Sequence, residues 1–192
     1  MSTMLIARWV SILAHPFVMV VLMVGAATEQ LGAPGQVVRT VGVVALFTIL
    51  PIVILTIWQV RRGAWMNVDA SNLRDRPLLF TVAIVSMIAL VGYLVALSRH
   101  SFLLRGSTVT LVMLVVCAVA TRWVKVSLHM AAAGLTATAL ILLGSAVGWF
   151  VAGVLPFLGW SRFALRRHTV LEVALGLAFG VIGGFAVKLV SN

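Results

Sequence analysis

Two short polar stretches stand out in an otherwise apolar chain, KVSLHM at residues 125–130 and SRFALRRHTVLEV at residues 161–173. Each stretch combines a histidine with cationic side chains. Histidine titrates near neutral pH, so it can serve as a nucleophile or as a general acid. Cationic side chains bind phosphate and stabilise the charge that develops during phosphoryl transfer. Together the two stretches predict chemistry on a phosphate group.

The second stretch contains a histidine and a carboxylate at helical spacing. His168 and Glu172 are four residues apart, so on a helix they share one face. The carboxylate can accept the imidazole N–H, fix the tautomer and leave the other ring nitrogen free to attack. His129, in the first stretch, supplies a second imidazole. One histidine would be the nucleophile and the other would protonate the leaving oxygen.

Cations and a hydroxyl could form an anion cradle beside these histidines. The candidate phosphate ligands are Arg76, Lys125, Ser127 and Arg162. A guanidinium group matches the geometry of phosphate, and backbone amides at a helix start also bind anions. Arg74 either joins this cradle or pairs with Asp75 within its own loop. With only four Asp and Glu in the chain, a pair of Mg²⁺ ions lacks ligands, so we expect no metal and no cofactor.

The composition predicts an integral membrane protein built from helices. Of 192 residues, 62% are hydrophobic and 9% are charged, whereas soluble domains carry about 25% charged residues. The apolar segments are long and lack the alternation of barrel strands, so helices are expected to cross the membrane. They run approximately over 4–26, 37–60, 78–98, 106–124, 129–160 and 169–190. We therefore predict an all-α, polytopic membrane helical bundle with six to seven transmembrane helices, forming one domain over 1–192.

The fifth apolar segment decides whether the two histidines can meet. As one helix, residues 129–160 would be about 48 Å long, well beyond a hydrocarbon core of roughly 30 Å. Gly144, Gly148, Gly153 and Pro156 offer places to break it. We predict two short helices, about 128–144 and 148–160, folded back at a tight turn. This hairpin would bring both polar stretches to the same side of the membrane.

The charge pattern favours a lipid bilayer and an anionic lipid as partners over nucleic acid. The net charge is +10, and the cations lie at the ends of the apolar segments, where they meet headgroups or phosphate. By the positive-inside rule, the side with the polar stretches would be cytoplasmic, because it carries more Lys and Arg. Cations that belong to an active site would raise the number of Lys and Arg on that side in the same way. The first apolar run exceeds the usual 7–15 residues of a signal peptide, so we interpret it as a retained span.

The polar stretches resemble motifs of the type 2 phosphatidic acid phosphatase (PAP2) superfamily. Its third motif is Ser-Arg, five residues, His, three residues, Asp, and the matching residues are Ser161, Arg162, His168 and Glu172. Its second motif is Pro-Ser-Gly-His, and the matching residues are Val126, Ser127, Leu128 and His129. Its first motif is Lys, six residues, Arg-Pro; Arg76 and Pro77 match it, whereas Asp69 stands at the lysine position. Bacterial members with arginine-rich first motifs are the more similar ones, which implies a bacterial inner membrane.

The resemblance implies a role for each matching residue. His168 would be the nucleophile, His129 the general acid and Glu172 the carboxylate that orients His168. The phosphate ligands would be Ser127, Arg76 and Arg162. We further infer that Lys125 takes the place of the missing first-motif lysine. His15, which precedes a proline, is expected inside the bundle and outside the chemistry.

The expected function is that of a metal-independent phosphoric ester hydrolase acting on a membrane lipid phosphate through a phosphohistidine. The substrate could be phosphatidic acid, phosphatidylglycerophosphate or a polyprenyl phosphate or diphosphate, because lipid tails meet only generic apolar helix faces. Two alternatives remain open. One is a relative that binds anionic lipids without catalysis, and the other is a small lipid transporter, which would also need buried cations.

Overall fold

The chain folds into helices joined by short loops, as predicted. The computed structural model describes residues 3–65, 72–97 and 102–191. The α-helices in the described residues are α1 (Thr3–Leu13), α2 (Pro16–Gln30), α3 (Val37–Val44), α4 (Leu50–Arg61), α5 (Arg76–Ala96), α6 (Phe102–Ala120), α7 (Leu128–Leu142), α8 (Ala146–Ala164) and α9 (Val170–Ser191). A 3₁₀ turn, η1 (Pro34–Gln36), precedes α3, and a π-helical turn, η2 (Ala45–Ile49), joins α3 to α4.

The described helices are consistent with a multi-pass membrane protein. Five helical segments are long and apolar enough to cross a bilayer. They are Pro34–Arg61, which comprises η1, α3, η2 and α4, together with Arg76–Ala96, Phe102–Ala120, Ala146–Ala164 and Val170–Val190. The bent pair α1 and α2 adds a sixth if the two form one span. The shorter helix α7 has 15 residues, of which ten are buried inside the bundle. Because α7 is surrounded by other helices, its side chains pack against protein rather than lipid.

The first apolar segment differs from the single span that the sequence predicts. It is divided into α1 and α2, which are bent by 42° at the break. Pro16 lacks an amide hydrogen and restricts His15 to extended backbone, here with φ −63° and ψ 143°. The break therefore ends α1 and exposes the start of α2 to a side-chain cap, which His15 itself supplies.

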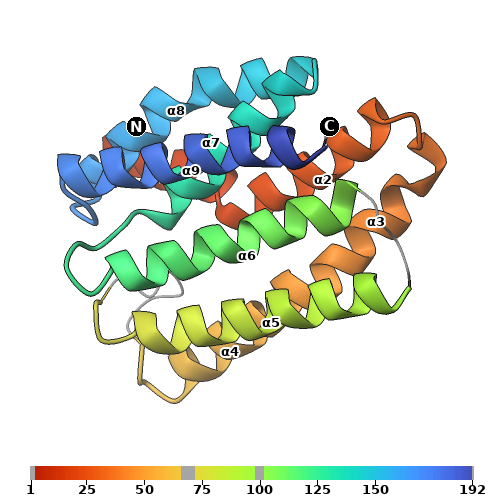
Figure 1. The fold of residues 1–192 in the computed structure, drawn as a ribbon. Helices are drawn as coiled ribbons and strands as arrows, with labels where there is room; N and C mark the ends of the chain where they lie inside the picture. Colours follow the sequence, from red (N-terminus) through yellow and green to blue (C-terminus); the bar gives the residue numbers. More distant parts are fainter. Residues whose placement is uncertain (1–2, 66–71, 98–101, 192) are drawn as a thin grey trace.

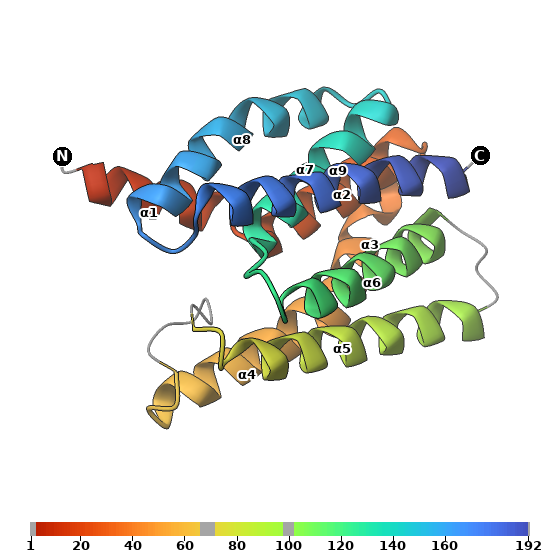
Figure 2. The ribbon, with the colours of Figure 1, turned by 60° about the vertical axis from the view of Figure 1, so that its left-hand side comes forward.

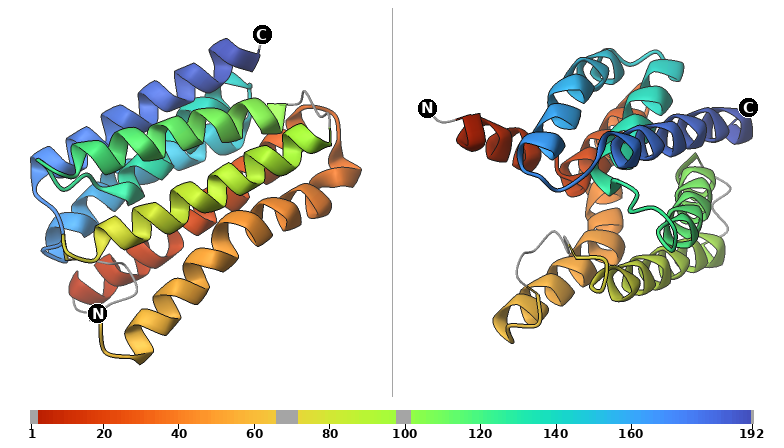
Figure 3. Two further views of the ribbon diagram at one scale, coloured as in Figure 1. Left: turned by 60° about the horizontal axis from the view of Figure 1, so that its bottom comes forward. Right: turned by 90° about the vertical axis from the view of Figure 1, so that its left-hand side faces the viewer.

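The helices form two layers, seen side by side in Figure 2. In the first layer α7 packs against α9, α8 and α2, and α1 packs against α8. In the second layer α5 packs against α4 and α6. The layers are joined where α6 meets α9 and where α3 meets α2. Figure 3, in its end-on right panel, shows that the loop leading into α7 crosses from the second layer to the first.

The predicted break within residues 129–160 is confirmed. Helices α7 and α8 fold back at a turn in which Gly144 has φ +78°, a conformation that glycine adopts readily. Gly148 then approaches the backbone of Ile141 so closely that a Cβ would overlap its nitrogen. Helix α8 continues to Ala164, four residues beyond the predicted end, and passes through Pro156 without stopping.

Glycines let α7 and α9 run parallel in close contact (Figure 1). A Cβ at Gly176 would overlap Ser127 O, and a Cβ at Gly180 would overlap Ala131 O. Small residues four apart on one helix face permit this backbone approach between membrane helices. The first turns of α7 and α9 consequently lie at the same end of the bundle, which brings His129 near Glu172.

Gly180→Leu is expected to destabilise the protein, at or above the upper end of the roughly 1–3 kcal/mol typical of overpacking. The added side chain has no space against Ala131, so α9 must move away from α7. The thermal unfolding midpoint in detergent measures the effect. Gly153→Leu on α8 is the matched control, because nothing lies within 4 Å of a Cβ there. Equal midpoints for the two variants would contradict the close packing.

Candidate active site

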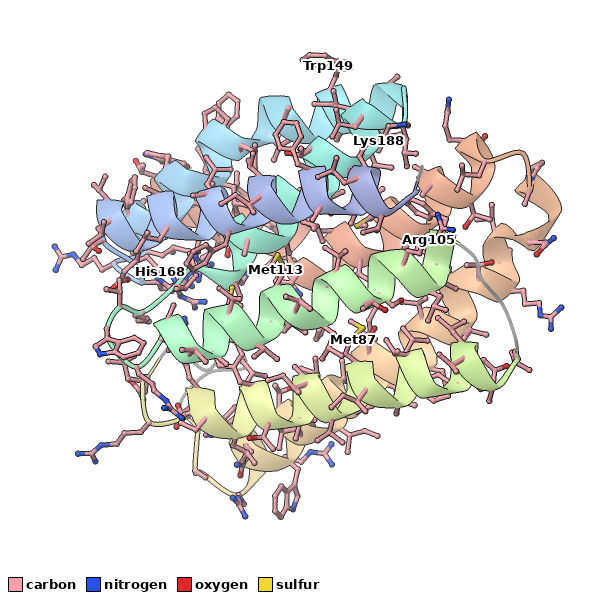
Figure 4. All side chains as sticks on the ribbon, viewed as in Figure 1. Met87, Arg105, Met113, Trp149, His168 and Lys188 are labelled. Carbon is pink, nitrogen blue, oxygen red and sulfur yellow. The ribbon has the colours of Figure 1, made fainter. Side chains whose placement is uncertain are left out.

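The candidate site lies at one end of the bundle, where the two layers meet. His168 belongs to the loop between α8 and α9, and Figure 4 shows it at the opposite end of the molecule from Arg105 and Lys188. His129 is in the first turn of α7, and Arg76 begins α5 in the other layer. The site therefore draws on helices that are distant in sequence.

His168 is held by the carboxylate that its spacing predicts. The Nδ1 atom of His168 lies 2.8 Å from Oε2 of Glu172, and the imidazole side chain is only 3% exposed. Glu172 is fixed in turn, because its carboxylate accepts from Thr169 N at 3.2 Å while its own N–H donates to Thr169 Oγ1 at 3.4 Å. This reciprocal arrangement is a capping box at the start of α9. It keeps the hydrogen on Nδ1 and leaves Nε2 as the basic nitrogen.

Hydrogen bonds hold the loop that carries His168 to the end of α8 and to the loop before α7. Arg162 O accepts from Arg167 N at 3.0 Å and from His168 N at 3.4 Å, which closes the loop on the end of α8. Lys125 Nζ donates to Arg167 O at 2.8 Å, across the gap between the loops preceding α7 and α9. Ser127 N donates to Glu172 O at 3.2 Å, so the start of α7 is tied directly to α9.

Two buried arginines reach the site from different layers. Arg76 Nη1 donates to Val126 O at 2.6 Å, and Arg76 is 5% exposed. Arg162 Nη1 donates to Ser11 Oγ at 2.6 Å, and Arg162 is 2% exposed. Buried cations are costly unless a negative group balances them. Since the Val126 carbonyl is neutral, its hydrogen bond with Arg76 leaves the charge to be balanced by another group.

Three buried polar atoms at this end have no hydrogen-bond partner among the described residues. They are Arg76 Nε, Ser127 Oγ and His129 Nε2. Their residues are at most 7% exposed. Leaving such groups unsatisfied costs roughly 1–3 kcal/mol each, and more for charged groups. A guanidinium N–H, a hydroxyl and an imidazole N–H can each donate to an oxyanion, so an anionic ligand would satisfy such atoms.

A cavity of about 870 Å³ begins at the site and extends between the layers. The lining of its polar end includes His15, Arg76, Lys125, His129, Arg162 and His168. The remaining walls are largely apolar and come from α2, the α3–α4 segment, α5 and α6. The hydroxyls of Thr28, Thr48 and Thr110 donate to carbonyls of their own helices at 2.7–2.8 Å, so they offer no hydrogen to a ligand. Away from the cations, the cavity suits hydrocarbon.

His168→Gln is expected to make the protein's stability less sensitive to acid. Burial, with the positive charges of Arg162 and Arg76, lowers the pKa of His168 from 6.5 to about 3. The unfolded chain binds a proton below pH 6.5 that the folded protein does not, so stability falls as the pH drops toward about 3. Thermal midpoints between pH 7 and 5 should therefore fall more steeply for wild type than for His168→Gln. Parallel curves would mean that His168 is charged in the fold.

Five of the eight predicted site residues line the cavity at this end of the bundle, and they are Arg76, Lys125, His129, Arg162 and His168. Arg74 is exposed in the turn before α5 and does not line the cavity. Asp69, at the position of the family lysine, lies outside the described residues. Glu172 and Ser127 do not line the cavity either. Within the described ranges, no three side chains of His, Cys, Asp or Glu come together as a metal site.

Two residues near the site were missed from the sequence. Ser11 accepts from Arg162, and His15 makes a ring contact with His129 at 5.1 Å between centroids. Both flank the break between α1 and α2. The available signal was the proline after His15, which predicts extended backbone and an open helix start. No family model matches the chain, and searches of curated proteins and of solved structures found no match.

Proposed function

We propose that the protein is a metal-independent lipid phosphatase of the PAP2 type, acting on a phosphate ester of a membrane lipid. The observation that carries the proposal is the pair of unpartnered donors on Arg76 and His129, which line the polar end of the cavity together with the oriented imidazole of His168. Anion-binding donors beside a nucleophile are the parts that phosphoryl transfer requires.

The reaction would proceed in two steps that exchange the roles of the histidines. In the first step, His168 Nε2 attacks phosphorus, the bond from phosphorus to the ester oxygen breaks, and His129 gives that oxygen its proton. Glu172 balances the positive charge that forms on the imidazole of His168. In the second step, water attacks phosphorus, His129 takes the proton of water, and the phosphorus–nitrogen bond breaks to release inorganic phosphate.

The shape of the cavity supports a lipid as the substrate. Its polar end is lined by cations and imidazoles, and its apolar walls continue between the layers as far as Leu94 and Leu97 at the other end of α5. The stretch of α5 from Arg76 to Leu94 is about 27 Å long at 1.5 Å per residue. A phosphate held at the polar end would thus place its hydrocarbon chain along this apolar wall.

Phosphate release by the purified protein in detergent tests the proposal. Phosphatidic acid, phosphatidylglycerophosphate and a polyprenyl phosphate are compared, with and without a chelator. We expect release from at least one of them and no loss with chelator. Binding of these lipids without release would favour the non-catalytic relative, and movement of intact lipid between leaflets of a vesicle would favour the transporter. Release that stops on removal of Mg²⁺ would require a different mechanism.

Ala83→Trp is expected to reduce turnover of a long-chain lipid phosphate by about tenfold or more while sparing a soluble short-chain phosphate. Ala83 lines the cavity on α5, and the indole would occupy the space for the chain. The two substrates are compared at saturating concentration with the same preparation. Ala89→Trp is the matched control, because Ala89 is exposed on α5 and does not line the cavity. An equal loss on both substrates would argue against a chain-binding cavity.

A further inference from the structure

A third histidine touches the candidate general acid. The rings of His15 and His129 are 5.1 Å apart between centroids and nearly perpendicular, at 85°, so the edge of one ring faces the plane of the other. Phe17 also contacts the ring of His15, with centroids 4.5 Å apart. Both histidines line the polar end of the cavity. Nothing in the two-step reaction uses His15.

His15 is fixed in one tautomer by the helix that it caps. Its Nδ1 accepts the backbone N–H of Phe17 at 3.3 Å, so in the neutral ring the hydrogen is on Nε2. Protonating Nδ1 would break this cap, which satisfies one of the free amides at the start of α2. The cap therefore favours a neutral ring at this position. A neutral ring can contact His129 without adding another positive charge to a site that already holds several.

The backbone that presents His15 is anchored to the helix of His129. Thr136 Oγ1 on α7 donates to Met19 O on α2 at 3.3 Å. Ala14 and Met19 belong to the same buried cluster as Met130 of α7. Helix α2 is thus held against α7 one turn beyond His15 and two turns beyond His129, which restrains the two rings relative to one another.

We propose that His15 is a positioning residue that holds the ring of His129 in the orientation needed to protonate the leaving oxygen. This inference rests on the proposed phosphatase function and adds a role that neither the spacing nor the resemblance assigns. The break at Pro16 then has a functional consequence, because a continuous helix would have no cap at this residue.

Leaving-group dependence tests the role of His15. An alkyl phosphate needs its leaving oxygen protonated, whereas the nitrophenolate of p-nitrophenyl phosphate leaves without a proton. We expect His15→Asn, which keeps a capping side chain but loses the ring, to lower kcat for a short-chain phosphatidic acid by about 10–100-fold with KM within threefold. Turnover of p-nitrophenyl phosphate should change by less than about threefold. His15→Phe, which keeps a ring, should recover part of the loss.

The ratio of the two rates is the decisive quantity, because both are measured on one preparation and the folded fraction cancels. His129→Ala should change the ratio in the same direction and by a larger factor. Trp149→Leu should leave the ratio unchanged, because Trp149 is an exposed residue of α8. An unchanged ratio in His15→Asn overturns the positioning role while the phosphatase function stands. If wild type releases phosphate from neither substrate, the phosphatase function itself fails and this inference fails with it.

Discussion

His168→Ala is expected to lower phosphate release from a lipid phosphate by about three orders of magnitude or more, the largest effect of any single substitution. In the proposed reaction, the variant removes the atom that forms the covalent bond to phosphorus. Removing a nucleophile that acts together with a general acid lowers the rate by this much, because the remaining catalytic groups cannot accelerate the reaction without it. The residual rate would come from phosphate binding alone.

The phosphoenzyme itself gives a second measurement. With ³²P-labelled substrate and an alkaline quench, wild type should retain label on the protein and His168→Ala should not. Glu172→Gln should keep the label but form it more slowly, because the amide removes the charge that balances the imidazole. Arg166→Ala is the matched control in the same loop, since Arg166 is exposed and does not line the cavity. Label retained in His168→Ala would assign the nucleophile to another residue.

Arg76→Lys is expected to lower kcat/KM by about 10²–10³, the second largest effect, equivalent to roughly 3–4 kcal/mol of transition-state stabilisation. The guanidinium donates to Val126 O through Nη1 while Nε remains available. A lysine ammonium is a single point and cannot hold the carbonyl and a phosphate oxygen in this fixed geometry. Steady-state rates measured at saturating and at limiting lipid concentrations report kcat and kcat/KM, so together they separate the effect on kcat from the effect on KM.

Arg74 provides the comparison for Arg76, because it is two residues away and has the same side chain. It is exposed and lies outside the cavity lining, so Arg74→Lys should change kcat/KM by less than about threefold. A loss in Arg74→Lys as large as that in Arg76→Lys would mean that the turn before α5 closes over the substrate. A small loss in both variants would remove Arg76 from the phosphate site.

Several features of the site follow from short-range geometry and were predictable. The contact between His168 and Glu172 depends only on their spacing of four residues at the start of one helix. The break within residues 129–160 follows from the thickness of a bilayer and the position of its glycines. Once that hairpin is accepted, the two polar stretches must lie on the same side of the membrane. The two local rules together place the predicted residues of both polar stretches, 125–130 and 161–173, at one end of the bundle.

Other features depend on how the helices pack, and spacing along the chain does not reveal them. Arg76 reaches Val126 across fifty positions, whereas Arg74 lies exposed in the turn before α5 and outside the cavity lining. The contact between His15 and His129 requires both the bend at Pro16 and the seating of α2 on α7.

The amino-acid sequence by itself determined that this protein is a bundle of membrane helices, with the polar stretches 125–130 and 161–173 at the same end. Composition, segment length and i to i+4 spacing act within a few turns of one helix, so they can be deduced without knowing the neighbours. Only the tertiary structure decided which cation enters the site, which donors are left without a partner and which ring touches His129. Those outcomes depend on contacts between helices, where the close approach at Gly176 and Gly180 sets the distance.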